Sequence, residues 1–274
     1  MEETIWRVLL TSPAPGPWNM ALDEAILEAV GKNTALPTLR LFAWQPACLS
    51  LGYAQPVKDV DQKRLANLGW DLVRRPTGGR AILHTDELTY SVIAPLHEPH
   101  VYGSILESYR RLSQALLCAL SLIGLDAGAE KDRAGVQKST PAGPVCFEVP
   151  SNYEITVAGK KLIGSAQARR REGVLQHGSL PLTGDLTRIV QVLEFDSEPL
   201  RQSAAARLLE RAVTVEACLG RVVTWQEAAQ AFITGFEQAL NIQLLAAGPS
   251  PDELERTRQL VISRYSHPDW TNRA

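Results

Sequence analysis

One cysteine of this sequence stands where a thiol is able to do chemistry. Cys146 lies between two prolines that discourage a regular buried strand, and it follows a polar stretch containing glycine and proline. The other three fit interior positions, because Cys48 falls in a strand pattern and Cys118 and Cys218 fall in helical apolar patterns. From the residues alone, Cys146 is a candidate nucleophile, and an inert thiol is the alternative.

Lys161 is the second candidate, in the segment 159–167 (GKKLIGSAQ). If Leu162 faces a core, strand alternation puts Lys161 and Ile163 on the opposite face, with Gly164 leaving room for a ligand. An ammonium placed there would bind a carbonyl group, stabilise an oxyanion and lower the pKa of a nearby thiol. A pair of solvated hairpin lysines is the alternative.

Two adjacent glycines, Gly78 and Gly79, follow Arg74 and Arg75 and precede Arg80. Glycine permits backbone torsions that other residues resist, so we expect a tight loop that approaches a ligand closely. Its amides would cradle a phosphate or a carbonyl group, and the arginines would engage the phosphate of a substrate carrier. The standard nucleotide-binding patterns, G-x-x-x-x-G-K-[ST] and a helix-opening G-x-G-x-x-G, are both missing.

His84 follows this loop and allows two interpretations. It is either a base for Cys146 or a packed residue hydrogen-bonded at a strand end, with Asp86 and Glu87 near enough in sequence to orient it. The histidines of residues 97–100 (HEPH) lack metal-ligand spacing, and the proline between them disfavours a helical pairing. We therefore predict no metal site.

The composition predicts an ordinary globular protein that binds no nucleic acid. Hydrophobic residues make up 45% and charged residues 21% of the 274 residues, and the formal net charge is -2. A nucleic-acid partner would normally leave a concentrated basic surface. The one basic cluster, residues 169–171, is either a solvated turn between strands or a local docking patch for an acidic protein.

The sequence predicts no export signal and no membrane span. Glu2 and Glu3 stand where a secretory signal needs basic residues, and no apolar run approaches the roughly 20 residues that cross a bilayer. These features predict a cytoplasmic protein. The reducing conditions of the cytoplasm would keep its cysteines as free thiols.

Hydrophobic periodicity and turn residues predict a mixed α/β or α+β protein, built as one large domain. Strands are expected at residues 38–44, 48–51, 70–75, 81–84, 88–95, 153–157, 162–167 and 174–182. Helices are expected at residues 18–30, 57–68, 105–125, 186–193, 199–211, 225–239 and 251–265. The polar stretch 127–144 is the best candidate for a mobile loop.

Several segments, in collinear order over most of the chain, resemble the biotin and lipoate protein ligase superfamily. They are residues 18–24 (WNMALDE), 74–84 (RRPTGGRAILH), 87–91 (ELTYS), 161–167 (KLIGSAQ) and 176–180 (QHGSL). Within that superfamily, residues 146–154 (CFEVPSNYE) and the T-G-G-R form of residues 77–80 resemble the LipM-type octanoyltransferases.

This resemblance implies a class II aminoacyl-tRNA synthetase-like and biotin synthetase-like fold, with a mixed sheet flanked by helices. Residues 1–250 would form the catalytic domain and residues 251–274 a C-terminal helical extension of it. It implies a ping-pong octanoyltransferase that uses no ATP, metal or other cofactor. Cys146 would take the octanoyl group from octanoyl-acyl carrier protein, and a lysine of glycine-cleavage H protein or of another lipoyl domain would receive it.

The resemblance also implies the site residues. Cys146 and Lys161 are expected to be catalytic, with the lysine holding the thioester carbonyl or stabilising its tetrahedral intermediate. The residues expected to bind substrate are Arg75, Gly78, Gly79, Arg80, His84, Gly164 and Ser165. An apolar channel would accept the eight-carbon chain, at about 0.8 kcal/mol per buried methylene.

Three other functions remain open. A lipoate-protein ligase would share the fold and Lys161 but would activate free lipoate with ATP, and such ligases usually carry a third glycine where Arg80 stands. An amidotransferase that moves octanoyl or lipoyl groups between carrier proteins would also use a cysteine on this fold. A non-enzymatic binder of acyl groups or lipoyl domains would form no covalent intermediate.

Overall fold

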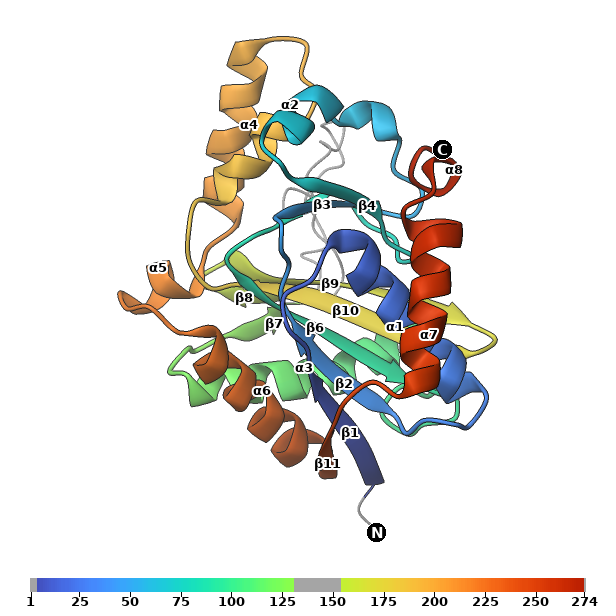
Figure 1. Cartoon of the computed structure of the whole chain (residues 1–274). Helices are drawn as coiled ribbons and strands as arrows, with labels where there is room; N and C mark the ends of the chain where they lie inside the picture. Colours follow the sequence, from blue (N-terminus) through green and yellow to red (C-terminus); the bar gives the residue numbers. More distant parts are fainter. Residues whose placement is uncertain (1–3, 131–153, 274) are drawn as a thin grey trace.

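The computed structural model describes residues 4–130 and 154–273, and its centre is an eight-stranded mixed sheet. The strands lie in the order β11-β1-β2-β6-β10-β9-β8-β7 (Figure 1). Their bounds, in that order, are Ile242–Ala247, Thr4–Leu10, Thr38–Phe42, Glu87–Ala94, Gly173–Pro181, Lys160–Arg170, Glu154–Val157 and Gly128–Glu130. β1 pairs in parallel with β11 and β2, and the pairings from β2 to β7 are antiparallel.

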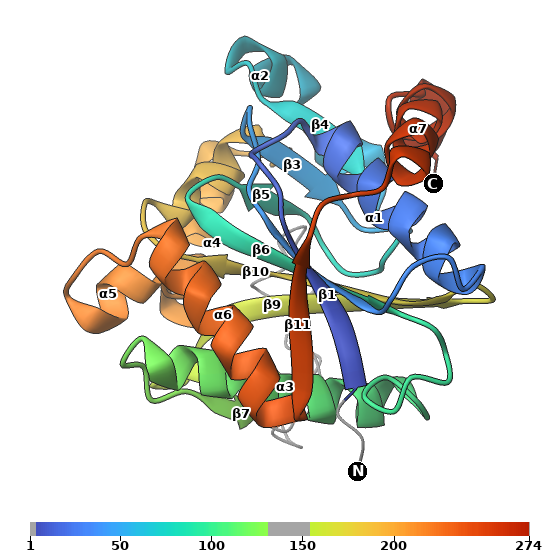
Figure 2. The same ribbon diagram turned by 60° about the horizontal axis from the view of Figure 1, so that its bottom comes forward.

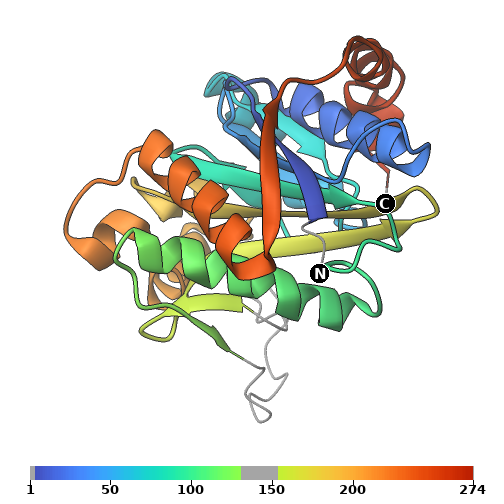
Figure 3. The same ribbon diagram turned by 90° about the horizontal axis from the view of Figure 1, so that it is seen from below.

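Helices cover both faces of this sheet. Helices α3 (Ile105–Leu122) and α6 (Trp225–Leu240) lie side by side on one face, whereas α1 (Gly16–Gly31) and α7 (Pro251–Leu260) cover the other (Figures 2 and 3). Every residue of the central strands β6 and β10 is buried, as expected for strands covered on two sides. None of the helices in the two described ranges is long and apolar enough to cross a membrane.

A second, three-stranded sheet holds the glycine loop. Strand β3 (Cys48–Leu51) lies between β4 (Asp71–Arg74), to which it is parallel, and β5 (Ile82–His84), to which it is antiparallel. Its apolar residues pack against η3 (Leu186–Val192) and α4 (Glu198–Arg211). Because the chain between β4 and β5 is the loop that contains Gly78 and Gly79, the small sheet fixes that loop at both ends.

The mixed α/β architecture is confirmed, and most of the predicted elements are present, with two corrections. Residues 57–68 form a 3-10 turn, η1 (Val57–Asp59), and a short helix, α2 (Gln62–Asn67), rather than one helix. The break comes at Asp61, whose carboxylate caps α2 by accepting a hydrogen bond from the Arg64 amide at 3.0 Å. The predicted helix at residues 186–193 is the 3-10 helix η3.

Besides β7, four elements lie outside the predictions, namely the strands β1 and β11 and the helices α5 (Val215–Leu219) and α8 (Pro268–Thr271). The two strands pair with each other from opposite ends of the sequence, so neither shows its partner locally. In the predicted loop at residues 127–144, residues 128–130 form strand β7, and the remainder from residue 131 onward lies outside the described residues.

The α3–α6 interface depends on one glycine. A Cβ atom added at Gly235 of α6 would lie 2.6 Å from the Ala119 backbone nitrogen of α3, which cannot move without shifting the helix. We predict that Gly235→Ala lowers the free energy of unfolding by about 1–3 kcal/mol, because overpacking outweighs the better helix propensity of alanine. Urea denaturation checks this, with the exposed Gln230→Ala in the same helix as the control. Equal or greater stability of Gly235→Ala would contradict the close packing.

Candidate active site

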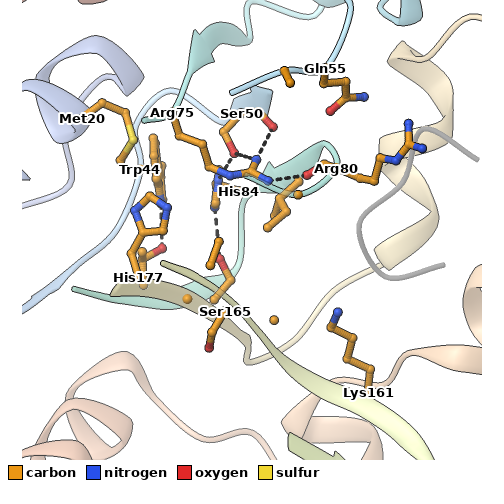
Figure 4. A pocket seen from close by; sticks show the side chains of 18 of the residues that line it. Met20, Trp44, Ser50, Gln55, Arg75, Arg80, His84, Lys161, Ser165 and His177 are labelled. Atoms are coloured by element: carbon orange, nitrogen blue, oxygen red, sulfur yellow. Dashed lines mark hydrogen bonds between the residues drawn. The ribbon is translucent and has the colours of Figure 1, made fainter. Parts of the chain in front are cut away.

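A cavity of about 420 Å³ lies between the small sheet, α1 and strands β9 and β10 (Figure 4). Seven of the residues predicted to form the site line it, namely Arg75, Gly79, Arg80, His84, Lys161, Gly164 and Ser165. Gly78 belongs to the same loop but is not part of the lining, and Cys146 lies outside the described residues. The structure therefore brings together side chains from residue 75 to residue 165.

Lys161 enters this pocket from the start of β9. Its side chain is only 4% exposed, and its Nζ donates a hydrogen bond to Oε1 of Glu154 in β8 at 2.6 Å. The neighbouring Lys160 instead donates from its Nζ to the Leu209 carbonyl at 2.7 Å. Lys161 is thus a buried lysine paired with a carboxyl group, not one of two solvated hairpin lysines.

The predicted face of Ile163 is wrong, and a β-bulge is the reason. Lys161 is paired with Thr156 and Ile163 with Ile155, so two steps along β9 match one step along β8, and Leu162 is the extra residue. Leu162 and Ile163 consequently both join the main hydrophobic core. The bulge resets the alternation and brings Gly164 to the same pocket as Lys161.

Arg75 shapes the glycine loop. Its guanidinium is buried and donates hydrogen bonds to the carbonyl oxygens of Ser50 at 2.9 Å, Gly78 at 2.9 Å and Arg80 at 2.7 Å. Gly79 has φ of +96°, a conformation that favours glycine. These hydrogen bonds make Arg75 a support for the loop, and its role in substrate binding stays a prediction.

His84 is buried at the end of β5 with both ring nitrogens hydrogen-bonded. Its Nδ1 lies 2.6 Å from Oε1 of Glu87 and its Nε2 lies 2.7 Å from the Ser50 hydroxyl. The ring also stacks on Trp44, with centroids 4.0 Å apart. This geometry matches the packed histidine of the two interpretations. Of the two acidic residues expected to orient it, Glu87 does so, whereas Asp86 pairs with Arg188.

The structure adds a polar chain that sequence reasoning did not assign to the site. His177 lines the pocket, and its Nε2 lies 2.6 Å from the Thr77 hydroxyl of the glycine loop. Its Nδ1 faces the buried Asp23 carboxylate at 3.7 Å. Burial would raise the pKa of Asp23, but the Arg40 guanidinium at 2.7 Å and His177 hold it below its ordinary value. Asp23 and His177 lie in the segments WNMALDE and QHGSL, which resemble the superfamily, but the sequence assigned neither residue a role.

The cysteines inside the described ranges fit interior or structural positions. Cys48 is buried in β3, and burial raises the pKa of its thiol well above the ordinary value. Cys118 and Cys218 are half-buried, and burial also raises the pKa of Cys218. None of these three lines the pocket. A depressed pKa is what marks a reactive thiol, so Cys48 and Cys218 do not match a nucleophile.

Comparison with known proteins identifies the family of this chain. The family model described as "Lipoyl protein ligase A/B catalytic domain" matches residues 15–237, so the chain belongs to that family. Its relatives include proteins named octanoyltransferase LipM from Kyrpidia tusciae and Bacillus subtilis. The first is 40% identical and covers 98% of this chain and 98% of the relative, and the second is 36% identical and covers 98% and 99%.

Solved structures of lipoate ligases support the same family assignment. A bi-partite lipoate protein ligase from Thermoplasma acidophilum matches with a TM-score of 0.80 and 26% identity, covering 98% of this chain and 96% of that chain. A lipoate-protein ligase A bound with ATP matches with a TM-score of 0.78 and 26% identity, covering 98% and 99%. The predicted superfamily and its fold class are confirmed.

The buried ion pair gives a first prediction. Glu154→Gln keeps a hydrogen-bond acceptor beside Lys161 but removes the charge that balances the ammonium, so we expect the free energy of unfolding to fall by about 1–3 kcal/mol. Glu227→Gln, which breaks the exposed pair with Arg221 at 2.8 Å, is the matched control and should cost less than about 1 kcal/mol. Chemical denaturation measures both, and equal losses would mean that burial does not strengthen the Lys161 pair.

His177 gives a second prediction. Burial lowers the pKa of its imidazole below the ordinary value of 6.5, so the unfolded chain binds a proton at higher pH than the folded one. The stability contributed by neutral His177 is present above pH 6.5 and is lost as the pH falls through the lower folded-state pKa. His177→Gln should therefore lose less stability than the wild type between about pH 7 and pH 5. Urea denaturation across that range checks this, and parallel curves for the two proteins would contradict it.

Proposed function

We propose that this chain transfers an octanoyl group from octanoyl-acyl carrier protein to a lysine of a lipoyl-domain carrier, through a thioester on Cys146. The observation that carries the proposal is 36–40% identity, over nearly the whole length, to proteins named octanoyltransferase LipM. The placement of the buried Lys161 side chain in the pocket gives the proposal a chemical basis. Glycine-cleavage H protein is the acceptor we propose first.

In the first half-reaction, the Cys146 thiolate attacks the thioester carbonyl carbon of the donor. A new carbon–sulfur bond forms, the carbonyl electrons move to oxygen, and the tetrahedral intermediate expels the carrier's thiolate, which takes up a proton. Lys161 donates a hydrogen bond to that oxygen. A preorganised donor of this kind contributes about 3–4 kcal/mol to the transition state.

In the second half-reaction, the neutral amine of the acceptor lysine attacks the Cys146 thioester. The carbon–nitrogen bond forms, the amine loses a proton, and the Cys146 thiolate leaves and is ready for another donor. The exchange onto sulfur is nearly balanced in energy, and the final amide is more stable than the thioester. ATP is therefore not required.

The shape of the pocket supports this orientation of the acyl group. Figure 4 shows Lys161 and Arg80 on one side of the pocket and Met20 and Trp44 on the opposite side. The thioester would lie beside Lys161, and the apolar chain would extend toward Met20 and Trp44 and be stabilised by about 0.8 kcal/mol per buried methylene. Figure 4 also shows Ser165 between the two sides, on β9.

An ATP-dependent lipoate-protein ligase is the second candidate. Two solved lipoate ligases match this chain with TM-scores of 0.80 and 0.78, so the fold serves both chemistries. The two candidates differ in their need for a cysteine and for ATP, which gives the test.

We predict that the wild type octanoylates a purified H protein from octanoyl-acyl carrier protein without ATP, and that Cys146→Ser lowers the rate by at least about 1000-fold. Circular dichroism of both proteins controls for folding. ATP-dependent modification of the acceptor by free octanoate or lipoate, unchanged in Cys146→Ser, would establish the ligase instead.

The two adjacent lysines give a matched pair of variants. Lys161→Ala should lower the transfer rate by about 100-fold to 1000-fold, because it removes the proposed oxyanion donor. Lys160→Ala, whose ammonium bonds the Leu209 carbonyl outside the pocket, should stay within about twofold of the wild type. Single-turnover rates of acceptor octanoylation measure this. Similar losses in both variants would remove Lys161 from the reaction.

A further inference from the structure

The C-terminal end of the described chain lies against the rim of the pocket. The family match ends at residue 237, and helix α7, the single turn η4 (Val261–Tyr265) and α8 (Pro268–Thr271) follow it. Figure 1 shows this red end of the chain beside the light-blue segment that follows β3. Ala54, Gln55 and Pro56 of that segment line the pocket. The contact between these two parts therefore bears on the site.

Arg74 makes the contact on the pocket side. Its guanidinium is fully buried at the end of β4. Its NH1 group donates hydrogen bonds to the carbonyl oxygens of Gly52 at 2.8 Å, Tyr53 at 3.2 Å and Gln55 at 2.6 Å. One guanidinium nitrogen thus gathers three carbonyl groups of residues 52–56, which have no sheet partner of their own in the small sheet.

The same guanidinium holds the C-terminal end. Its Nε donates to the Trp270 carbonyl at 3.2 Å and its NH2 donates to the Thr271 carbonyl at 2.7 Å. In return, Nε1 of Trp270 donates to the Arg74 carbonyl at 2.9 Å. Two cations contact the indole ring, with the guanidinium carbons of Arg264 at 3.7 Å and Arg273 at 4.7 Å from ring centroids.

This end of the chain is itself anchored on the main domain. Arg264 pairs with Glu24 of α1 at 2.5 Å, and the Tyr265 hydroxyl donates to the same carboxylate. Arg256 of α7 pairs with Glu28 of α1 at 2.8 Å. The C-terminal end is therefore a fixed support, from which Arg74 reaches toward the pocket.

Residues 52–56 in turn contact the glycine loop. The Tyr53 amide donates to the Thr77 carbonyl at 2.8 Å, and a Cβ atom added at Gly52 would lie 1.9 Å from the Gly79 carbonyl oxygen. The two loops are thus in direct contact, and Arg273 donates to the Tyr53 hydroxyl at 2.7 Å from the other side.

We propose that Trp270 and the turn around it brace residues 52–56 through Arg74, and that this brace sets how tightly the pocket holds the acyl donor. Trp270 touches no reacting atom and is a positioning residue. The effect on the donor rests on the proposed octanoyl transfer. The effect on residues 52–56 does not, because it concerns the loop alone.

The test uses the full chain with Trp270→Ala, and Trp270→Phe as the conservative variant. Trp270→Ala should raise KM for octanoyl-acyl carrier protein by about tenfold and leave kcat within about twofold, because the transition-state groups are intact but the rim is loose. Trp270→Phe keeps an aromatic ring beside the two arginines but loses the Nε1 donor. Its KM should therefore lie between the KM of the wild type and that of Trp270→Ala. Arg258→Ala, on the exposed face of α7, should match the wild type.

Hydrogen exchange gives a readout that needs no activity. In Trp270→Ala, the amides of Tyr53 and Arg75, which donate to Thr77 and Leu51, should exchange about tenfold faster, while the amides of α3 stay unchanged. Leu120→Ala, in the α3–α6 core, controls for a general loss of stability and should not raise KM.

The possible results distinguish a failure of the brace from a failure of the proposed function. A wild-type KM in Trp270→Ala, or a rise in KM shared equally by Leu120→Ala, would overturn the brace. An unchanged Tyr53 amide in Trp270→Ala would overturn it as well. A wild type that transfers no octanoyl group would instead remove the proposed function, and the exchange measurement would still decide whether the brace exists.

Discussion

Two adjacent buried arginines at the end of β4 are the constraint on which the pocket depends. A buried guanidinium must find acceptors for its N–H groups, because an unpaired buried charge is strongly destabilising. Arg75 meets this need with carbonyl groups of Ser50 and the glycine loop, and Arg74 meets it with residues 52–56 and the C-terminal turn. Each arginine thus fixes irregular chain that has no sheet of its own. The hydrogen bonds that these two buried guanidinium groups require therefore hold the rim of the pocket in place.

The wall behind this rim is a closed polar network. Glu87 accepts hydrogen bonds from Ser179 at 2.8 Å and Thr89 at 2.5 Å, and it lies 2.6 Å from His84. Trp44 donates to the Thr89 hydroxyl at 2.7 Å and stacks on His84. Groups satisfied in this way are held in one arrangement. The network positions an apolar surface for a ligand, and the Lys161–Glu154 pair supplies the charge on the side where the reaction is proposed.

Local pattern was enough to predict many of the elements and several pocket residues. The alternation around Leu162 predicted the strand that carries Lys161, and the glycine pair predicted the loop. It could not predict the bulge at Leu162, because the register between β8 and β9 depends on pairing rather than on β9 itself. It also could not predict the contact of His177 with Asp23, or the pairing of β1 with β11, since each joins residues far apart in the sequence.

The arginines show a further limit of sequence reasoning. Arg75 was expected to bind substrate, since a guanidinium beside two glycines suits a phosphate. Only the fold shows that its donors serve the loop. Arg74 was expected, with the other arginines, to engage the phosphate of a substrate carrier, but its acceptors are carbonyl groups of two segments that no motif connects. The resemblance to a known superfamily suggested the reaction, and the structure showed which hydrogen bonds hold the pocket in shape.

The most direct test of the account is intact-protein mass spectrometry after mixing the wild type and Cys146→Ala with octanoyl-acyl carrier protein, without ATP or acceptor. If Cys146 carries the octanoyl group, the wild type gains the mass of one octanoyl group, the variant gains none, and the added mass is lost when H protein is supplied. A wild type without an adduct, or an adduct that persists in Cys146→Ala, would contradict it.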